Sequence, residues 1–197
     1  MTLASAGALV LSPLRIERWA LGRVDARVER FGMGPTSARS AAIRLASDAA
    51  SHVYVVGFAG ALDGGLPPGE VFVADAVLAP VDDGSPRDPV ACDHTEAAAA
   101  LRDAGLPVTV GPLISSSKVV TGSERARFAE SGARAVDMES YWLAPLAVGR
   151  AWSVIRVIVD TPSRELFNPL RTMVSGVRGL RVLRRVAEAL FSSGEAK

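Results

Sequence analysis

Three carboxylates in this sequence stand where they could act on a bound molecule, each close to the end of a predicted strand: Glu17, Glu139 and Asp160. Glu139 lies where a strand passes into a helix, and the positive end of the helix dipole favours its ionised form. A carboxylate there can accept hydrogen bonds from two vicinal hydroxyls, such as those of a ribose. Alternatively, Asp137 or Glu139 only caps the helix. Position alone leaves both interpretations open.

Asp160 and Glu17 are each suited to proton transfer. Asp160 ends a buried strand, where desolvation would raise the pKa of its carboxyl group and allow it to donate a proton to a leaving nitrogen. The alternative is an Asx turn before Pro162. Glu17 is a candidate base that activates water, although a glutamate on a helix surface explains the same position.

Glycines follow two other predicted strands. Gly32-Met33-Gly34 comes after one strand, and a segment from Gly57 to Gly60 comes after the next. Glycine lets a base or a sugar approach the backbone closely, but a tight turn requires the same residue. Both interpretations remain open from the sequence.

Strand-like and helix-like segments alternate along the chain, and the elements they predict must bring these residues together. We predict an α/β fold, a three-layer αβα sandwich with a mixed, largely parallel central sheet, in which residues 1–197 form one domain. In such sheets ligands bind at the carboxyl ends of the strands, where the three carboxylates are predicted. The predicted strands are 4–11, 26–31, 52–57, 71–78, 107–114, 133–137 and 152–160. The predicted helices are 13–21, one beginning near 35, 95–104, 123–131, 139–148 and most of 166–190, and the predicted loops include 58–69 and 82–89.

Composition argues against several classes of function. The 197-residue chain has a formal net charge of +1, so no basic excess indicates a nucleic-acid partner. The arginines between residues 171 and 185 alternate with Val and Leu at helical spacing, which predicts a solvated helix face. The single cysteine, Cys92, is typical of a reducing compartment. No apolar run reaches the ~20 residues of a membrane helix, so we expect a cytoplasmic protein without an integral membrane segment.

Other catalytic classes lack their motifs. A dinucleotide-binding enzyme would need a G-x-G-x-x-[GA] turn after the first strand, whereas the nearest match follows the second strand and ends in Ser37. A Ser-His-Asp hydrolase would have to use His52 or His94, which are more simply surface or capping residues. One cysteine and two unclustered histidines make a zinc site implausible, so we predict no metal.

Five segments, in this order, resemble the nucleoside phosphorylase/nucleosidase superfamily. They are GMG (32–34), VVGFAGAL (55–62), LPPGEVFVAD (66–75), AVDMES (135–140) and IRVIVD (155–160). The second and third resemble the family's glycine loop and its continuation. The last two resemble its V-x-M-E and [VI]-R-x-[IV]-S-D signatures, and the match spans nearly the whole chain.

The resemblance implies a role for each carboxylate in breaking a bond between sugar and purine. Glu139 would hold the ribose 2′- and 3′-hydroxyls and stabilise positive charge growing on the sugar. Asp160 would protonate, or hydrogen-bond to, purine N7, and Glu17 would orient the attacking water. Met138 would pack against the sugar or the base. The other substrate-binding residues implied are Gly34, Phe58, Ala59, Gly60 and Val119.

Departures from the family pattern bear on the nucleophile. Phe58 stands where the family usually has Ser or Thr, and Val55 where the hexameric phosphorylases have an arginine, so both favour water over phosphate. Against this, the segment PLR (13–15) resembles a phosphate-binding segment, which makes Arg15 the candidate phosphate ligand. The two alignments leave open whether Glu17 or Arg15 faces the site. Val159 replaces the serine that normally orients the aspartate after it.

Within the superfamily, the DMES and DTP segments most resemble the hopanoid-associated branch. That resemblance implies hydrolysis of an adenine nucleoside with a 5′ substituent, adenosylhopane being the expected example, and a small-molecule, lipid-linked partner. The alternatives are a phosphate-dependent purine nucleoside phosphorylase and a catalytically inactive nucleoside-binding module. We expect no cofactor, orthophosphate being a co-substrate only in the phosphorylase alternative, and by analogy a homodimer.

Overall fold

The computed structural model describes residues 7–62, 64–79, 88–161 and 169–192, with side chains from residue 176 onward in the last range. In this part of the chain eight strands form one sheet. They are β1 (Ala8–Ser12), β2 (Arg27–Arg30), β3 (His52–Ala61), β4 (Val71–Leu78), β5 (Val90–Ala91), β6 (Val108–Ser115), β7 (Ala135–Asp137) and β8 (Ala151–Asp160). The helices are α1 (Arg15–Leu21), α2 (Gly34–Arg44), α3 (Thr95–Asp103), α4 (Glu124–Ala129), α5 (Ser140–Leu143), the 3-10 helix η2 (Ala144–Ala147) and α6 (Pro169–Phe191).

Five of the strands close into a ring. β3 pairs with β8, β8 with β4, β4 with β6, β6 with β7, and β7 returns to β3. β1 and β2 extend the sheet beyond β3, and β5 extends it beyond β4. Most pairings are parallel, so the sheet is mixed and largely parallel, as predicted. The ring carries the carboxyl ends of β3, β7 and β8 to one place.

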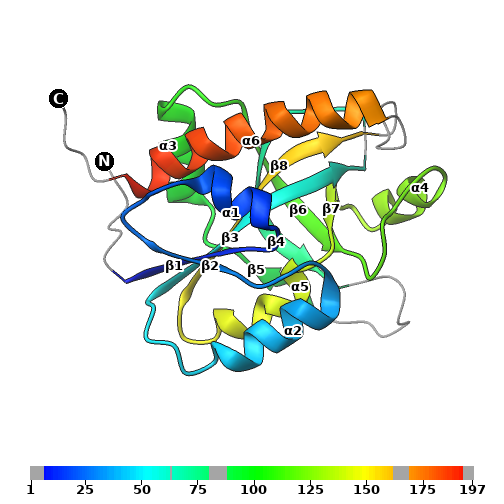
Figure 1. The fold of residues 1–197 in the computed structure, drawn as a ribbon. Coiled ribbons are helices and arrows are strands. Elements are labelled where there is room, and N and C mark those ends of the chain that lie inside the picture. The colour runs from blue at the N-terminus through cyan, green and yellow to red at the C-terminus, as the bar shows by residue number, and fades with distance from the viewer. Residues whose placement is uncertain (1–6, 63, 80–87, 162–168, 193–197) are drawn as a thin grey trace.

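Helices cover both faces of this sheet (Figure 1). α1, α3 and α6 bury their apolar sides against one face, in a core that includes Val10, Val56 and Leu183. α2, α5 and η2 cover the other face, in a core that includes Leu11, Val55 and Leu143. The predicted three-layer αβα sandwich is therefore confirmed.

The arginine-rich end of the chain behaves as its spacing predicts. In α6 Leu183, Val186 and Leu190 are buried, whereas Arg181 and Arg184 are exposed. The arginines therefore form the solvated side of an amphipathic helix. None of the helices in the described ranges is long and apolar enough to cross a membrane.

Two predicted boundaries are wrong, and each has a local cause. The segment predicted as a glycine-rich loop from residue 58 begins as strand, because β3 continues to Ala61 by pairing with both β8 and β7. The helix predicted over 139–148 is the four-residue α5 followed by η2, whose Pro145 cannot donate the hydrogen bond that an α-helix needs. The short strand β5 was not predicted, and residues 4–6, 82–87 and 166–168 of other predicted elements lie outside the described ranges.

We expect the packing of α6 on the sheet to contribute strongly to stability. Leu183 has none of its surface exposed, so Leu183→Ala should lower the free energy of unfolding by about 2–5 kcal/mol. Arg181→Ala, on the exposed side of the same helix, is the matched control and should change it by less than about 0.5 kcal/mol. Urea denaturation of both variants measures the difference, and equal stabilities would contradict this assignment of the core.

Candidate active site

One cavity of about 240 Å³ opens at the carboxyl ends of the strands. Ligand pockets of this kind are mostly apolar with a few polar groups that fix orientation. All three predicted carboxylates line it, although they lie far apart in the sequence. The lining residues are Pro13, Leu14, Glu17, Met33, Phe58, Ala59, Gly60, Lys118, Val119, Val120, Arg125, Val136, Asp137, Met138, Glu139, Val159 and Asp160.

Glu17 points from the first turn of α1 into the cavity and is 1% exposed, so the interpretation as a surface glutamate is wrong. Its Oε1 accepts a hydrogen bond from the Phe58 backbone N–H at 2.8 Å, and its Oε2 accepts one from the Leu14 N–H at 2.8 Å. Burial raises the pKa of Glu17 above its usual range, while the Leu14 hydrogen bond and the charge of Arg156 act in the opposite direction. Glu17 is thus a fixed carboxylate with increased basicity.

Arg156 lies behind Glu17 in the middle of β8, with none of its surface exposed. Its Nη2 donates to Asp137 Oδ2 and, at 2.9 Å, to Ser140 Oγ. Asp137 also accepts hydrogen bonds from the Ser115 hydroxyl at 2.6 Å and from the Ser140 N–H at 3.2 Å. Asp137 is therefore the residue that caps α5, and this contact leaves the side chain of Glu139 available for another role.

Glu139 instead contacts the N-terminus of α2. Its Oε1 accepts a hydrogen bond from the Gly34 N–H at 2.9 Å, and its Oε2 lies 3.8 Å from Arg156 Nη2. Gly34 has a φ of +84°, a conformation that favours glycine. Burial and the neighbouring charge of Asp137 raise the pKa of Glu139 to about 7, although Arg156 and the Gly34 hydrogen bond act to lower it. The helix dipole that favours the Glu139 carboxylate thus belongs to α2, whereas the sequence predicted its own helix.

Asp160 is 6% exposed and forms an ion pair that the sequence reasoning missed. Arg125 of α4 donates from Nη2 to Asp160 Oδ2 at 2.6 Å, and it also donates from Nη1 to the Ala61 carbonyl oxygen. Phe128, one turn further along α4, packs in an apolar cluster and holds this helix against the sheet. The segment SERAR (123–127) has the composition of a solvated helix, so its sequence gives little reason to expect a buried arginine. The one indication is that Arg125 lies three residues before the apolar Phe128, which places both on the same side of the helix.

Two glycines of β3 make room for these charged groups. A Cβ atom at Gly57 would lie 2.7 Å from Arg156 Nη1 and 2.9 Å from Glu17 Oε1. A Cβ atom at Gly60 would collide with Asp160 Oδ1, because a bulge in the pairing of β3 and β8 sets Gly60 opposite Asp160. The glycines are therefore needed for close approach, and no turn is present at either position.

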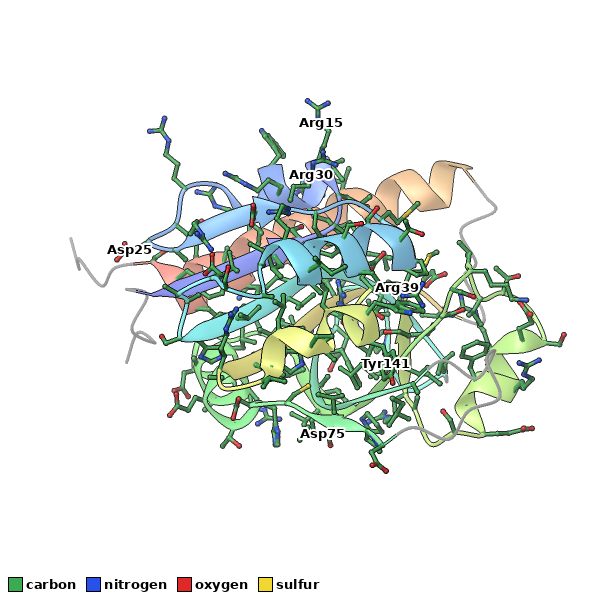
Figure 2. The ribbon with its side chains drawn as sticks, turned by 90° about the horizontal axis from the view of Figure 1, so that it is seen from below. Arg15, Asp25, Arg30, Arg39, Asp75 and Tyr141 are labelled. Carbon is green, nitrogen blue, oxygen red and sulfur yellow. The ribbon has the colours of Figure 1, made fainter. Side chains whose placement is uncertain are left out.

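The other predicted site residues divide into two groups. Five of them line the cavity: Met138, Phe58, Ala59, Gly60 and Val119. Gly34 does not line it, but its backbone N–H donates a hydrogen bond to Glu139, which does. Arg15 is exposed and lies outside the lining, and Figure 2 shows its side chain projecting away from the molecule. Of the two residues between which the sequence left a choice, Glu17 faces the cavity and Arg15 does not. No cluster of His, Cys, Asp and Glu suited to a metal ion occurs among the described residues.

Comparison with known proteins assigns the chain to a family. The model of the phosphorylase superfamily matches residues 14–173, so the chain belongs to the phosphorylase superfamily, as predicted. Among solved structures it is similar to a mutant methylthioadenosine nucleosidase (MTAN) of Helicobacter pylori with 5′-methylthioadenosine in its active site. The two structures superpose with a TM-score of 0.77 at 16% sequence identity, and the match covers 93% of this chain and 99% of the nucleosidase chain. It is also similar to the futalosine hydrolase of Helicobacter pylori: TM-score 0.75, 17% identity, 93% and 97% coverage. At such identities the likeness shows a shared fold. No curated protein sequence matches the chain.

We expect the charge of Glu139 to destabilise the fold. Its pKa of about 7 in the folded protein is above its ordinary 4.5, so the stabilisation that its protonated form provides is present at low pH and is lost as the pH rises through about 7. The glutamine in Glu139→Gln does not titrate. The free energy of unfolding of this variant minus that of the native protein should therefore be about 1–3 kcal/mol greater at pH 8 than at pH 5. Denaturant unfolding at the two pH values measures this, with the exposed Glu130→Gln as control. A difference independent of pH would rule out the raised pKa.

Proposed function

We propose that this protein hydrolyses the N-glycosidic bond of a purine nucleoside that carries a 5′ substituent. The observation that carries the proposal is the convergence of Glu17, Glu139 and Asp160 on one cavity. Membership of the phosphorylase superfamily and a fold shared with nucleosidases support the reaction class. Adenine as the base, adenosylhopane as the substrate, a homodimer and a cytoplasmic location extend the proposal and rest on the sequence resemblance.

Glu139 is the group proposed to hold the ribose. Its Oε1 accepts a hydrogen bond from Gly34, but a carboxylate has about four acceptor positions, which leaves capacity for the 2′- and 3′-hydroxyls. When the C1′–N9 bond breaks, positive charge grows on the sugar. A buried carboxylate whose ionised form is costly in the free protein, as the raised pKa shows, is stabilised by that charge. The interaction is therefore stronger in the transition state than with the substrate.

Glu17 is the group proposed to activate water. It faces the cavity, and its orientation is set by backbone N–H groups on two different elements. Arg156 behind Glu17 is paired with Asp137, so its charge offsets only part of the effect of burial, which raises the pKa of Glu17 and makes it a better base. In the proposed step the water oxygen bonds to C1′ while its proton passes to the Glu17 carboxylate.

Water suits this site better than phosphate. Of the cations that line the cavity, Arg125 is paired with Asp160 and Lys118 with Glu124. The part of the cavity next to Glu17 and Glu139 carries carboxylates, which repel a phosphate ion. Arg15, the predicted phosphate ligand, lies outside the cavity lining. These positions support hydrolysis over phosphorolysis.

The proposal is tested by following release of the free base. We expect the purified protein to release adenine from adenosine or 5′-methylthioadenosine without phosphate, and to leave a free sugar. Glu17→Gln and Glu139→Gln should each reduce kcat by at least about 100-fold, because each removes a charge that stabilises the transition state more than the bound substrate. The exposed Glu130→Gln should retain full activity. The native activity should fall as the pH drops below about 7, where Glu139 becomes protonated.

The alternatives give different results in the same assay. Release that requires phosphate and yields a sugar phosphate would replace hydrolysis by phosphorolysis. Binding of nucleosides without release of a base would identify a binding module. Full activity of Glu17→Gln would remove Glu17 from the mechanism.

A further inference from the structure

The outer side of α1 exposes a tryptophan that lies outside the cavity lining. Trp19 is 76% exposed, whereas Trp142 and Trp152 are 7% and 1% exposed. Ile16, three residues before Trp19, is 51% exposed. Residues three apart on a helix are neighbours, so these two side chains form one apolar surface. Scattered apolar side chains are ordinary on a protein surface, and the charges around this pair therefore decide what it can contact.

Arginines surround these two apolar side chains. Arg15 and Arg18 lie on α1 itself, and Arg23 follows the end of the helix. Arg15 and Arg23 are exposed, and Arg18 is half-buried. The one acidic residue of α1, Glu17, points into the cavity. All the charges on the outward side of α1 are therefore positive.

A fourth arginine reaches this side of the molecule from β2. Arg30 pairs with Ser12, at the end of β1 that leads into α1. Val28 packs in the apolar core beneath α1 and α6, and side chains two residues apart on a strand point to the same face. Arg30 therefore points to the α1 face of the sheet. Figure 2 shows Arg15 and Arg30 on one side of the molecule and Asp75 on the opposite side.

The positive charges of this region are not neutralised within the described part of the chain. None of the four arginines forms an ion pair with another described residue. By contrast, Arg44 on the other face of the sheet pairs with Glu29. Asp25 is exposed, but Figure 2 shows it well away from Arg15 and Arg30. Such a surface attracts a partner with many negative charges. We call the six residues the α1 surface: Arg15, Ile16, Arg18, Trp19, Arg23 and Arg30.

A bilayer that contains anionic phospholipids fits the α1 surface better than a second copy of this chain. Tryptophan is enriched at the level of the lipid headgroups, where its apolar ring and its N–H group are both accommodated. Arginine stems cover apolar groups while the guanidinium charges reach the lipid phosphates. In a two-fold dimer the same patch meets itself, so the arginines of the two copies would face one another without acidic partners.

We propose that the α1 surface docks this protein on an anionic phospholipid bilayer, with Trp19 and Ile16 entering the headgroup region and the four arginines contacting lipid phosphates. The contact is peripheral, because two apolar side chains bury only a small area. Met33 lines the cavity, is 59% exposed and follows Arg30 by three residues, so the docked bilayer lies near the cavity opening. The inference goes beyond the proposed hydrolysis and does not depend on it.

Sedimentation with lipid vesicles tests the docking. The native protein should bind vesicles made of equal parts of phosphatidylcholine and phosphatidylglycerol at least about 10-fold more tightly than vesicles of phosphatidylcholine alone, and added salt should weaken this binding. Because Trp142 and Trp152 are buried, a fluorescence change on binding reports on Trp19. Its emission should move to shorter wavelength on the anionic vesicles, and Trp19→Phe should abolish this shift.

Further variants separate the apolar contribution from the charged one. Trp19→Ser should weaken vesicle binding by at least about 10-fold, since it removes the largest apolar side chain of the α1 surface. The double variant Arg15→Gln, Arg30→Gln should weaken binding to the anionic vesicles by about 10-fold or more. The matched controls are on α2, which covers the other face: Ile43→Ser and Arg44→Gln should each change binding by less than about twofold. All the replaced side chains are exposed, so circular dichroism should show an intact fold.

Equal binding to both kinds of vesicle, or binding to neither, would overturn the proposal. Binding to the anionic vesicles that Trp19→Ser and the double variant leave unchanged would do the same. A native dimer that Trp19→Ser dissociates in analytical ultracentrifugation would assign the α1 surface to a second copy instead. Binding to a DNA duplex without binding to vesicles would assign it to a nucleic acid. None of these measurements needs turnover, so they decide the docking whether or not the protein cleaves a nucleoside.

Discussion

The Arg156 guanidinium, which has no exposed surface, is the charge on which the arrangement of the site depends. It extends from β8, which pairs with both β3 and β4, into a cluster of carboxylates and pairs directly with Asp137. Leaving one partner of such a pair buried alone costs about 3–5 kcal/mol, so each constrains the other. Asp137 also caps α5, and that contact determines where the chain turns after β7 and hence where Glu139 points. Gly57 lacks a side chain because Arg156 and Glu17 occupy that space.

The fold brings these groups together through the closure of its five-stranded ring. In an open parallel sheet, β3 and β7 would be separated by the strands between them. Here β7 pairs antiparallel with the last two residues of β3, so Asp137 and Glu139 come beside Gly60. The bulge between β3 and β8 shifts the register by one residue just before Asp160. Without that shift, the alternation of side chains along β8 would point Asp160 toward the opposite face.

The sequence predicted the parts of the site that depend on strand ends. Strong apolar runs mark β4 and β8, turn residues mark where strands stop, and the carboxylates after them follow from chain order alone. It could not predict features that depend on contacts between distant segments. β3 continues through its glycines because two other strands pair with it, and Arg125 is buried because α4 packs through Phe128. Neither feature can be predicted from the local sequence pattern. The sequence around Arg125, between Glu124 and Ala126, is typical of a solvated helix.

The buried charged residues of the site are predominantly acidic, and this affects which reaction the site favours. In the described part of the chain six charged residues are buried, and all of them lie at this site: Glu17, Asp137, Glu139, Asp160, Arg125 and Arg156. Four are acidic and two are basic, so the site is negative whenever its carboxylates are ionised. Such a site disfavours an anionic nucleophile, and it favours a reaction in which the sugar becomes positive as the bond breaks. Burial first, and then the charge of Asp137 as part of that imbalance, raise the pKa of Glu139 to about 7. Burial and the repulsion from Asp137 make the Glu139 carboxylate costly in the folded protein. Positive charge that develops beside this carboxylate offsets that cost, so the interaction favours the transition state.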